Sequence, residues 1–374
     1  MKTRNMRICY DYQIFSMETF GGISRYFVEL ASRLHKYPGT DVRIIAPLYR
    51  SKLLAAKSHE IPVLGFPFTG QIRGAVRITK RVSPCFSRVL SWAYKPDIVH
   101  ETYYSRNRTS SSSAKTVLTV HDFFEDMFPE LYPKWWRKTM EHRKDILRRA
   151  DHLICISECT RADLMRLYEV DPDRISVVHH ASSLTAPIAP VAAMGEPFFL
   201  YVGHRYAIKN FHSLLAAFAE SLSFKTHKLV CLGGSQITEE EQTRVKELGI
   251  PPDRIVQVGG GNDDLLSRYY ASAEAFVYPS LYEGFGIPLL EAMECGCPII
   301  CSNAGSIPEV AGDAVIYFDP KDIHSISNAM LRVAQSPSER RQLIMKGKVR
   351  CKQFSWDKCA QQTYSVYARL LDRL

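Results

Sequence analysis

Short runs of strand-forming residues alternate with helical segments along almost the entire chain. The strand candidates are apolar and rich in β-branched residues, and they include MRICYDY, DVRIIA, DIVHE and TVLTV in the first half and FFLYVG, KLVCLGG, AEAFVYPS and CPIICS in the second. The segments between them place apolar residues at helical spacing, as in Phe211, Leu214, Leu215 and Phe218. Because strands joined by helical crossovers run parallel, the pattern predicts an α/β protein with parallel sheets.

The length and one interruption of the pattern predict two domains. A chain of 374 residues exceeds what one hydrophobic core usually serves. A stretch rich in Pro, Ala and Ser that ends at Pro197 shows no periodicity and is interpreted as a linker. We predict Rossmann-like domains over 1–184 and 198–354, a linker over 185–197, and a further helix over 355–374. Ligands of such sheets bind at the carboxyl ends of the strands, so we expect the site in a cleft between the domains.

Composition limits the compartment and the cofactors. No apolar run reaches the length of about 18 residues that a membrane span needs, and the first residues lack the apolar stretch of a signal peptide. Ten cysteines without such a signal indicate free thiols and a cytoplasmic location. Cys295, Cys297 and Cys301 cluster, but no second group at zinc-site spacing accompanies them, so we expect buried thiols and no metal.

The net charge of +9 is distributed unevenly. The range 61–96 contains no acidic residue, and a second basic segment over 134–149 places Trp135 and Trp136 among lysines and arginines. The basic residues concerned are Arg73, Arg77, Lys80, Arg81, Arg88 and Lys95 in the first range and Lys134, Arg137 and Lys138 in the second. Solvated helix faces would explain both segments, and so would contact with the anionic inner leaflet of a membrane. No nucleic-acid recognition module accompanies the charge, and we expect no nucleic-acid partner.

Three candidate site residues follow strands of the first half. Gly21 and Gly22 come after the first strand and open a helix, where free backbone N–H groups bind anions and glycine permits close approach. Many helices begin with glycine, so this signal alone is weak. His121 directly follows the apolar run VLTV. A neutral imidazole there can hydrogen-bond a substrate oxygen, whereas a histidine that only caps or packs is the common alternative.

The second half adds two cations and two carboxylates. Arg205 and Lys209 lie four residues apart after the strand FFLYV, and such a pair suits a diphosphate, although a surface pair is the alternative. Glu283 and Glu291 flank the start of a predicted helix, for which Pro288 is placed as the first residue. The helix N-terminus favours negative charge, and each carboxylate can accept hydrogen bonds from two hydroxyls of a sugar. One glutamate per sugar is therefore a physically sensible assignment, whereas the alternative, charges that only stabilise a helix start, explains Glu291 but not the loop of Glu283.

The segment EGFGIPLLE, from Glu283 to Glu291, resembles the E-x7-E motif of retaining glycosyltransferases of family 4, which have the GT-B fold. The resemblance extends over nearly the whole chain and includes the paired glycines, VHD, VG…KN, VYPSLYEGFG, AGSIPEVAGDA and the terminal helix. YDYQIFSMETFGGISRYF together with YVGHRYAIKNF is similar to the bacterial branch that builds O-antigen and other surface polysaccharides, in which mannosyl- and rhamnosyltransferases are frequent. The resemblance also implies that the last helix crosses back to the first domain.

This family resemblance implies a role for each candidate. Glu283 would bind the donor sugar, Glu291 the ribose of the nucleotide, and Arg205 and Lys209 the diphosphate. The family commonly has arginine immediately after the glycine of VG, where this chain has His204. The amides of Phe285, Gly286 and Ile287 would hold phosphate and sugar, and His121 would contact the sugar near the reacting carbon. Gly22 would border both donor and acceptor, and Gly21 and Tyr104 would border the acceptor.

The implied reaction moves a hexose from a nucleotide sugar, for which GDP-mannose is favoured by family frequency, to a glycan or polyprenyl-diphosphate-linked acceptor. The cations would replace a metal at the leaving diphosphate. Two alternatives stay open, a sugar-nucleotide epimerase on the same fold and a non-enzymatic basic binding protein. A dinucleotide-dependent oxidoreductase is excluded, because no G-x-G-x-x-G opens the first helix and GGGNDD places Asp263 and Asp264 where phosphate would bind.

Overall fold

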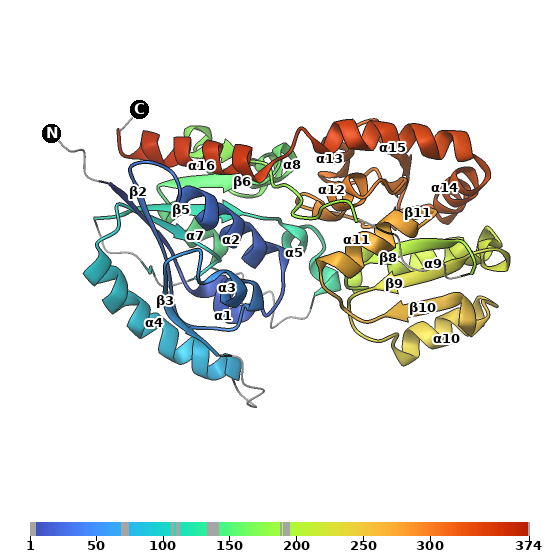
Figure 1. The fold of residues 1–374 in the computed structure, drawn as a ribbon, viewed down its shortest axis with the longest axis horizontal. Helices are drawn as coiled ribbons and strands as arrows, with labels where there is room; N and C mark the ends of the chain where they lie inside the picture. The colour runs from blue at the N-terminus through green and yellow to red at the C-terminus, as the bar shows by residue number, and fades with distance from the viewer. Residues whose placement is uncertain are drawn as a thin grey trace. The chain divides into compact units, whose positions relative to one another are not determined.

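The computed structural model divides the chain into two compact units. Unit 1 consists of Met1–His121, Lys134–His180 and Trp356–Leu374, and unit 2 of Asp122–Pro133 and Ala181–Ser355. The structure describes residues 5–68, 75–105, 108–109, 113–132, 142–187, 189 and 195–372, without the side chains of 75–78, 80, 81 and 207 (Figure 1). Both units are α/β, as the sequence pattern predicts.

Unit 1 is built on a seven-stranded parallel sheet in the order β3-β2-β1-β4-β5-β6-β7. The strands are β1 (Met6–Tyr10), β2 (Thr40–Tyr49), β3 (Val63–Pro67), β4 (Ile98–Glu101), β5 (Lys115–Val120), β6 (His152–Cys155) and β7 (Ile175–Val177). The helices are α1 (Gln13–Met17), α2 (Gly22–Leu34), α3 (Lys52–Lys57), α4 (Ala75–Tyr94), α7 (Arg143–Arg149), α8 (Glu158–Leu167), the 3₁₀ turn η2 (Pro172–Arg174) and α16 (Trp356–Leu370). The strand order reverses at β1, where Ile8 pairs with Val42 on one side and Ile98 on the other. Ligands of such sheets bind beside this reversal, at the carboxyl ends of the strands.

Unit 2 repeats the design with six parallel strands in the order β10-β9-β8-β11-β12-β13. The strands are β8 (Phe198–Val202), β9 (Lys228–Leu232), β10 (Ile255–Val258), β11 (Ala275–Tyr278), β12 (Ile299–Ser302) and β13 (Ile316–Phe318). The helices are α9 (Phe211–Glu220), α10 (Glu239–Glu247), α11 (Asp263–Ser272), α12 (Ile287–Glu294), α13 (Ile307–Ala311), α14 (Ile323–Gln335) and α15 (Pro337–Cys351), with 3₁₀ turns η3 (Ala207–Lys209), η4 (Ser223–Lys225) and η5 (Pro252–Arg254). Here the order reverses at β8, which pairs with β9 and β11.

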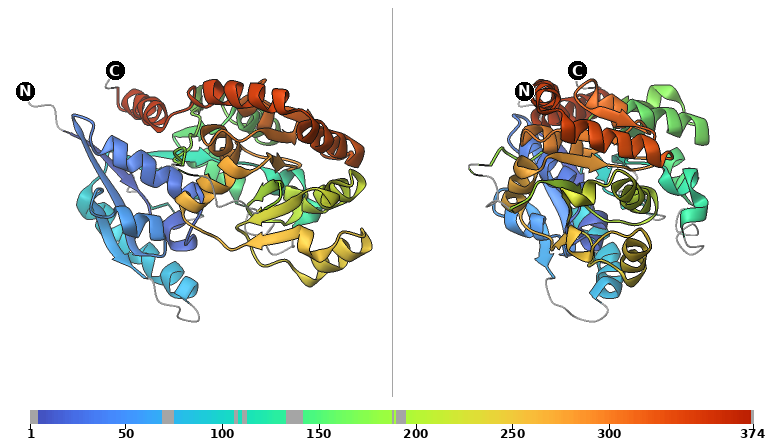
Figure 2. Two further views of the ribbon diagram at one scale, coloured as in Figure 1. Left: turned by 45° about the vertical axis from the view of Figure 1, so that its right-hand side comes forward. Right: turned by 90° about the vertical axis from the view of Figure 1, so that its right-hand side faces the viewer.

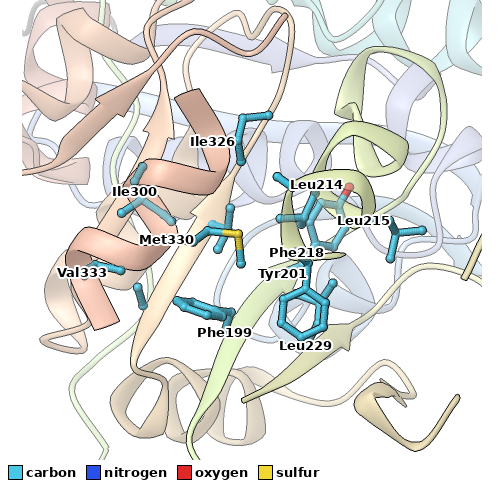
Figure 3. Packing of buried hydrophobic residues seen from close by; sticks show 14 of the residues in the cluster. Phe199, Tyr201, Leu214, Leu215, Phe218, Leu229, Ile300, Ile326, Met330 and Val333 are labelled. Carbon is cyan, nitrogen blue, oxygen red and sulfur yellow. The ribbon is translucent and has the colours of Figure 1, made fainter. Parts of the chain in front are cut away.

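The core of unit 2 explains why the helical spacing in its sequence is so regular. Leu214, Leu215 and Phe218 of α9 point to the sheet and meet Met330 of α14 over Phe199 of β8 (Figure 3). All five side chains are fully buried. Each large apolar side chain contributes about 1.5–3 kcal/mol when it is buried, so this face of α9 fixes the helix on the sheet. The helix in turn holds the loop that precedes it, which carries Lys209.

A short segment from the middle of the sequence also belongs to unit 2. Asp122–Pro133 includes α5 (Phe124–Met127) and the 3₁₀ turn η1 (Pro129–Leu131), although the sequence pattern assigns this range to the first domain. The segment contacts the rest of unit 2 through an aromatic pair: the ring centroids of Phe128 and Tyr282 lie 6.3 Å apart. The chain leaves unit 1 directly after β5 and His121.

The last helix, α16, packs on α2 of unit 1 (Figures 1 and 2). The hydroxyl of Tyr367 lies 2.6 Å from Nδ1 of His100 and 3.2 Å from the hydroxyl of Tyr10. At the opposite end of the helix, Nε of Arg33 donates to Asp357 at 2.7 Å. Buried hydrogen bonds therefore specify where the end of the chain returns.

Candidate functional site

The loop after β8 carries Lys209 to the end of β11. Asn210 adopts a left-handed conformation, and its side-chain amide donates to the carbonyl oxygens of Pro279 at 3.1 Å and Pro320 at 2.7 Å. These bonds tie the loop to the segment after β11. Nζ of Lys209 then donates to Oε1 of Glu283 at 2.7 Å. The structure thus brings together two residues that the sequence analysis selected independently.

The charges of this pair reinforce each other. Burial disfavours the ammonium of Lys209, but the Glu283 carboxylate outweighs burial, and the pKa of Lys209 lies above its ordinary value. Asp122 adds negative charge to the surroundings of the same ammonium. Burial and then Glu283 raise the pKa of the Tyr278 phenol, which hydrogen-bonds the carboxylate. Lys209 is therefore a permanent cation and Glu283 an acceptor held from two sides.

The helix N-terminus between the two glutamates is formed by α12. Gly286, with φ of 100°, precedes the helix in the left-handed region, where a side chain would be strained. Ile287 is the first helical residue and Pro288 the second, so the predicted start was one residue late. Phe285 is buried, and its ring packs 5.8 Å from that of Phe354. The first N–H groups of a helix lack intrahelical partners, so this end of α12 suits an anion.

Glu291 lies in the second turn of α12 and is partly buried. The hydroxyl of Tyr270 on α11 donates to its Oε2 at 3.3 Å. Burial, and after it the charge of Glu291, raises the pKa of Tyr270, so the phenol remains a donor. The neutral phenol of Tyr270 therefore orients the carboxylate of Glu291.

A loop after β12 supports Glu283 and was not assigned from the sequence. The amide and the hydroxyl of Ser306 both donate to the carbonyl oxygen of Glu283, the hydroxyl at 2.9 Å. A Cβ at Gly305 would stand 2.9 Å from the same oxygen, and φ of this glycine is 58°. The motif AGS after a strand was the available signal, because a glycine there allows such a close approach.

Arg205 has a different environment from the one that the sequence analysis expected. Its guanidinium donates to Oε1 of Glu241 from Nε and to Oε1 of Gln257 from Nη1, both at 2.9 Å. Nη2 donates to the carbonyl oxygens of Ser235 at 2.7 Å and Gln236 at 3.0 Å. The side chain is only 2% exposed. These four bonds hold the guanidinium inside unit 2 and give Arg205 a role in positioning the loop that carries Lys209, while its contact with the diphosphate stays a prediction. His204 beside it is exposed.

In unit 1, His121 lies at the carboxyl end of β5. Its ring is 6% exposed and lies 5.9 Å from those of Tyr26 and His180 between centroids. Burial lowers the pKa of His121 to about 3, so the imidazole is neutral at physiological pH. Nε2 has no hydrogen-bond partner within the described part of the chain. The imidazole is neutral, as the sequence analysis expected, and its contact with a sugar oxygen stays a prediction.

The paired glycines open α2 as predicted, but a carboxylate already lies there. Gly21 is the N-cap, and Gly22 is the first helical residue. Oε2 of Glu18 accepts from the amide of Ser24 at 3.1 Å. A Cβ at Gly21 would overlap the Glu18 carboxyl group. A larger residue at Gly21 would displace the end of the Glu18 side chain, a residue that the sequence analysis missed although an acid just before a helix is a common capping signal.

Tyr104 follows β4 and covers a buried cation. The guanidinium carbon of Arg143 lies 4.9 Å from the centroid of the Tyr104 ring. The neighbouring Asp11, which follows β1, accepts from the hydroxyls of Thr102 at 2.6 Å and Thr109 at 3.0 Å. These bonds hold the segments after β1 and β4 together at the strand ends. Asp11 was not selected from the sequence, because a single acid after a strand carries no distinctive spacing.

Comparisons with known proteins match both halves of the chain. The family model described as Glycosyltransferase Family 4 matches residues 20–184, and the one described as Glycosyl transferases group 1 matches residues 187–350. The chain is 31% identical to O-antigen chain mannosyltransferase B of Escherichia coli over 93% of this chain and 96% of that protein. It is 28% identical to O-antigen chain mannosyltransferase RfbU of Salmonella typhimurium over 59% and 61%. Sucrose-phosphate synthase from Thermosynechococcus elongatus has a TM-score of 0.77 at 20% identity, over 99% of this chain and 100% of that one.

Proposed function

The chain belongs to the family 4 glycosyltransferases of the group 1 type and has the GT-B fold, and from this premise we propose that it is a retaining mannosyltransferase of surface-polysaccharide synthesis. The family confirms the resemblance seen in the sequence and makes the protein a hexosyltransferase. The observation that supports the proposed donor site in unit 2 is the Lys209–Glu283 pair beside the N-terminus of α12. The assignment of GDP-mannose and O-antigen is supported by the mannosyltransferases among the relatives.

Unit 2 binds the donor in this proposal. Lys209 offers three N–H donors, so it can keep Glu283 and still bind a phosphate oxygen. The amides of Phe285, Gly286 and Ile287 complete the diphosphate and sugar contacts. Glu283 accepts from hydroxyls of the hexose and Glu291 from those of the ribose. Arg205 keeps the Lys209 loop in place in this proposal, because its guanidinium donates to Glu241 and Gln257.

The chemical step follows from where charge develops. The bond between the anomeric carbon and the diphosphate breaks, the bond to the acceptor oxygen forms on the same face, and the acceptor hydroxyl passes its proton to an oxygen of the departing diphosphate. Negative charge accumulates on the leaving diphosphate, where Lys209 and the helix N-terminus stabilise it without reorganisation. Neutral His121 accepts a hydrogen bond from the sugar and adds no positive charge beside the oxocarbenium-like carbon.

Unit 1 binds the acceptor, with Gly21, Gly22 and Tyr104 as its border. The acceptor in this proposal is a glycan on a polyprenyl diphosphate, which the protein reaches as a peripheral protein on the anionic cytoplasmic face of the membrane. Among the residues that the structure describes, no helix combines the length and apolarity of a membrane span. The predicted membrane contacts Arg73, Lys134, Trp135, Trp136, Arg137 and Lys138 lie outside the described residues, as do the side chains of Arg77, Lys80 and Arg81. Arg88 and Lys95 are described and exposed.

The donor assignment is tested by binding and product analysis. Calorimetry with GDP-mannose, UDP-glucose and dTDP-rhamnose should show tight binding of GDP-mannose alone. Incubation with a short mannose-terminated acceptor should give GDP and an α-linked product by NMR. An altered hexose in the absence of acceptor would indicate an epimerase. Binding of another nucleotide sugar in place of GDP-mannose would refute the donor, and a β-linked product would refute retention.

A further inference from the structure

Helix α4 of unit 1 packs on β2 with its small polar face. Thr79, Ser83, Ser87 and Ser91 recur every four residues, and none is more than 2% exposed. The hydroxyl of Ser83 lies 3.3 Å from the carbonyl oxygen of Leu48 and donates to it. Small side chains let the helix approach the sheet closely, but they bury little apolar area.

The opposite face of α4 carries three large apolar residues that are exposed. Phe86, Val89 and Trp92 are spaced three apart, so they share one side of the helix, and they are 60%, 63% and 71% exposed. A surface helix normally buries such residues and exposes its hydroxyls. Although α4 also buries Tyr94 in the core and packs Leu90 against it, leaving these three side chains in water is unfavourable. Their exposure together on one side of the helix indicates that something covers this face in the working protein.

The exposed apolar surface continues onto the neighbouring edge strand. Phe66 of β3 is 74% exposed and borders a groove of about 600 Å³ between β3 and α4. Leu64, Val82 and Leu90 also line this groove. We call Phe66, Phe86, Val89 and Trp92 the α4 face.

The charge beside the α4 face identifies its partner. Arg88 and Lys95 are exposed and lie seven residues apart, which places them along one line of the helix. The whole range 61–96 contains no acidic residue. A second copy of the chain would bring like charges together here, whereas anionic lipid headgroups neutralise both cations. Apolar side chains flanked by cations are the signature of a surface that lies in a bilayer interface.

We propose that the α4 face docks on an anionic lipid bilayer, with Phe86, Val89 and Trp92 inserted below the headgroups and Arg88 and Lys95 at the lipid phosphates. The inference rests on the membrane-linked acceptor of the proposed function and names the surface that meets the membrane. The apolar residues contribute a contact that salt does not screen, whereas the two cations contribute one that salt weakens.

Vesicle co-sedimentation tests the proposal with the full chain. The wild type should sediment with phosphatidylglycerol–phosphatidylcholine vesicles, and bound Trp92 should show blue-shifted fluorescence that is missing in Trp92→Phe. The triple variant Phe86→Ser, Val89→Ser, Trp92→Ser should lower the partition coefficient by at least about tenfold. Arg88→Gln with Lys95→Gln should lower binding at low salt and change it little at high salt. Met345→Ser with Val349→Ser is the matched control, because these residues are 63% and 67% exposed on α15 of unit 2.

Activity on a short soluble acceptor separates this inference from the proposed function. The triple variant should keep wild-type turnover there, since none of its positions belongs to the candidate site. Wild-type vesicle binding with no mannosyl transfer would leave the α4 face supported and refute the function. If the wild type and the triple variant sediment equally with vesicles, the proposal that the α4 face binds the membrane is overturned. The membrane proposal would also be overturned if the wild type does not bind vesicles but forms a dimer in sedimentation velocity, and if the triple variant is a monomer.

Discussion

Arg205→Met separates a structural role of this arginine from direct binding of the diphosphate. The substitution preserves much of the side-chain volume and removes only the guanidinium. It leaves Glu241 as a buried carboxylate without its cation, and it leaves Gln257 and the carbonyl oxygens of Ser235 and Gln236 without their donor. Glu241 belongs to the capping box of α10, so the damage extends to that helix.

The expected loss of stability follows from the burial of the pair. The side chains of Arg205 and Glu241 are 2% and 8% exposed, so solvent screens the interaction little. Removing one partner of a buried ion pair costs about 3–5 kcal/mol, most of it from the unpaired charge that remains. For a unit of roughly 150–250 residues, this corresponds to a fall of about 6–20 °C in the melting temperature.

Scanning calorimetry of the full chain is the assay, with attention to the transition of unit 2. Arg244→Met is the matched control, because Arg244 lies on α10 and pairs with Glu247 at 3.1 Å but is 42% exposed. The control should change stability by no more than about 0.5 kcal/mol. The contrary result is a free energy of unfolding of Arg205→Met within about 1 kcal/mol of the wild-type value, together with a loss of GDP-mannose binding. That result would refute the positioning role and support the diphosphate role predicted from the sequence.

Further outcomes concern the donor site, the buried histidine and the terminal helix. Lys209→Ala and Glu291→Ala should each weaken donor use by about 1.5–3 kcal/mol, measured as kcat/KM at subsaturating donor, and unchanged kinetics would contradict the assignment. Lys209→Ala should also lower the melting temperature, because it leaves the carboxylate of Glu283 without its cation. Because the pKa of His121 falls from 6.5 to about 3 on folding, its neutral form contributes stability above pH 6.5 that is lost as the pH falls toward 3, and denaturant titrations of His121→Asn should show a shallower acid loss than the wild type. Tyr367→Phe should destabilise unit 1 by about 1–3 kcal/mol, because His100 loses the partner of its buried Nδ1; a melting curve that matches the wild type would show that α16 docks by apolar contact alone.

Much of the donor site could be predicted because its determinants are local. A glutamate at the end of a strand, a glycine that allows positive φ and a proline near the start of a helix set the geometry of Glu283–Glu291 within nine consecutive residues. Lys209 could be selected because strand ends of parallel sheets meet at one edge, whatever the exact packing. The ion pair of Lys209 with Glu283 joins residues 74 apart in the sequence, but both positions follow from the strand pattern.

The sequence by itself determined the alternation of strands and helices, the strand ends and the residue types at those ends, because periodicity and turn chemistry act over a few residues. The tertiary structure decided which way individual side chains face. Arg205 turns inward because Glu241 and Gln257, 36 and 52 residues away, lie within hydrogen-bond reach. The helical spacing of α4 defines two faces but not which one is buried, and close packing on β2 selected the serines. Partners distant in sequence fix such orientations, and no local pattern encodes them.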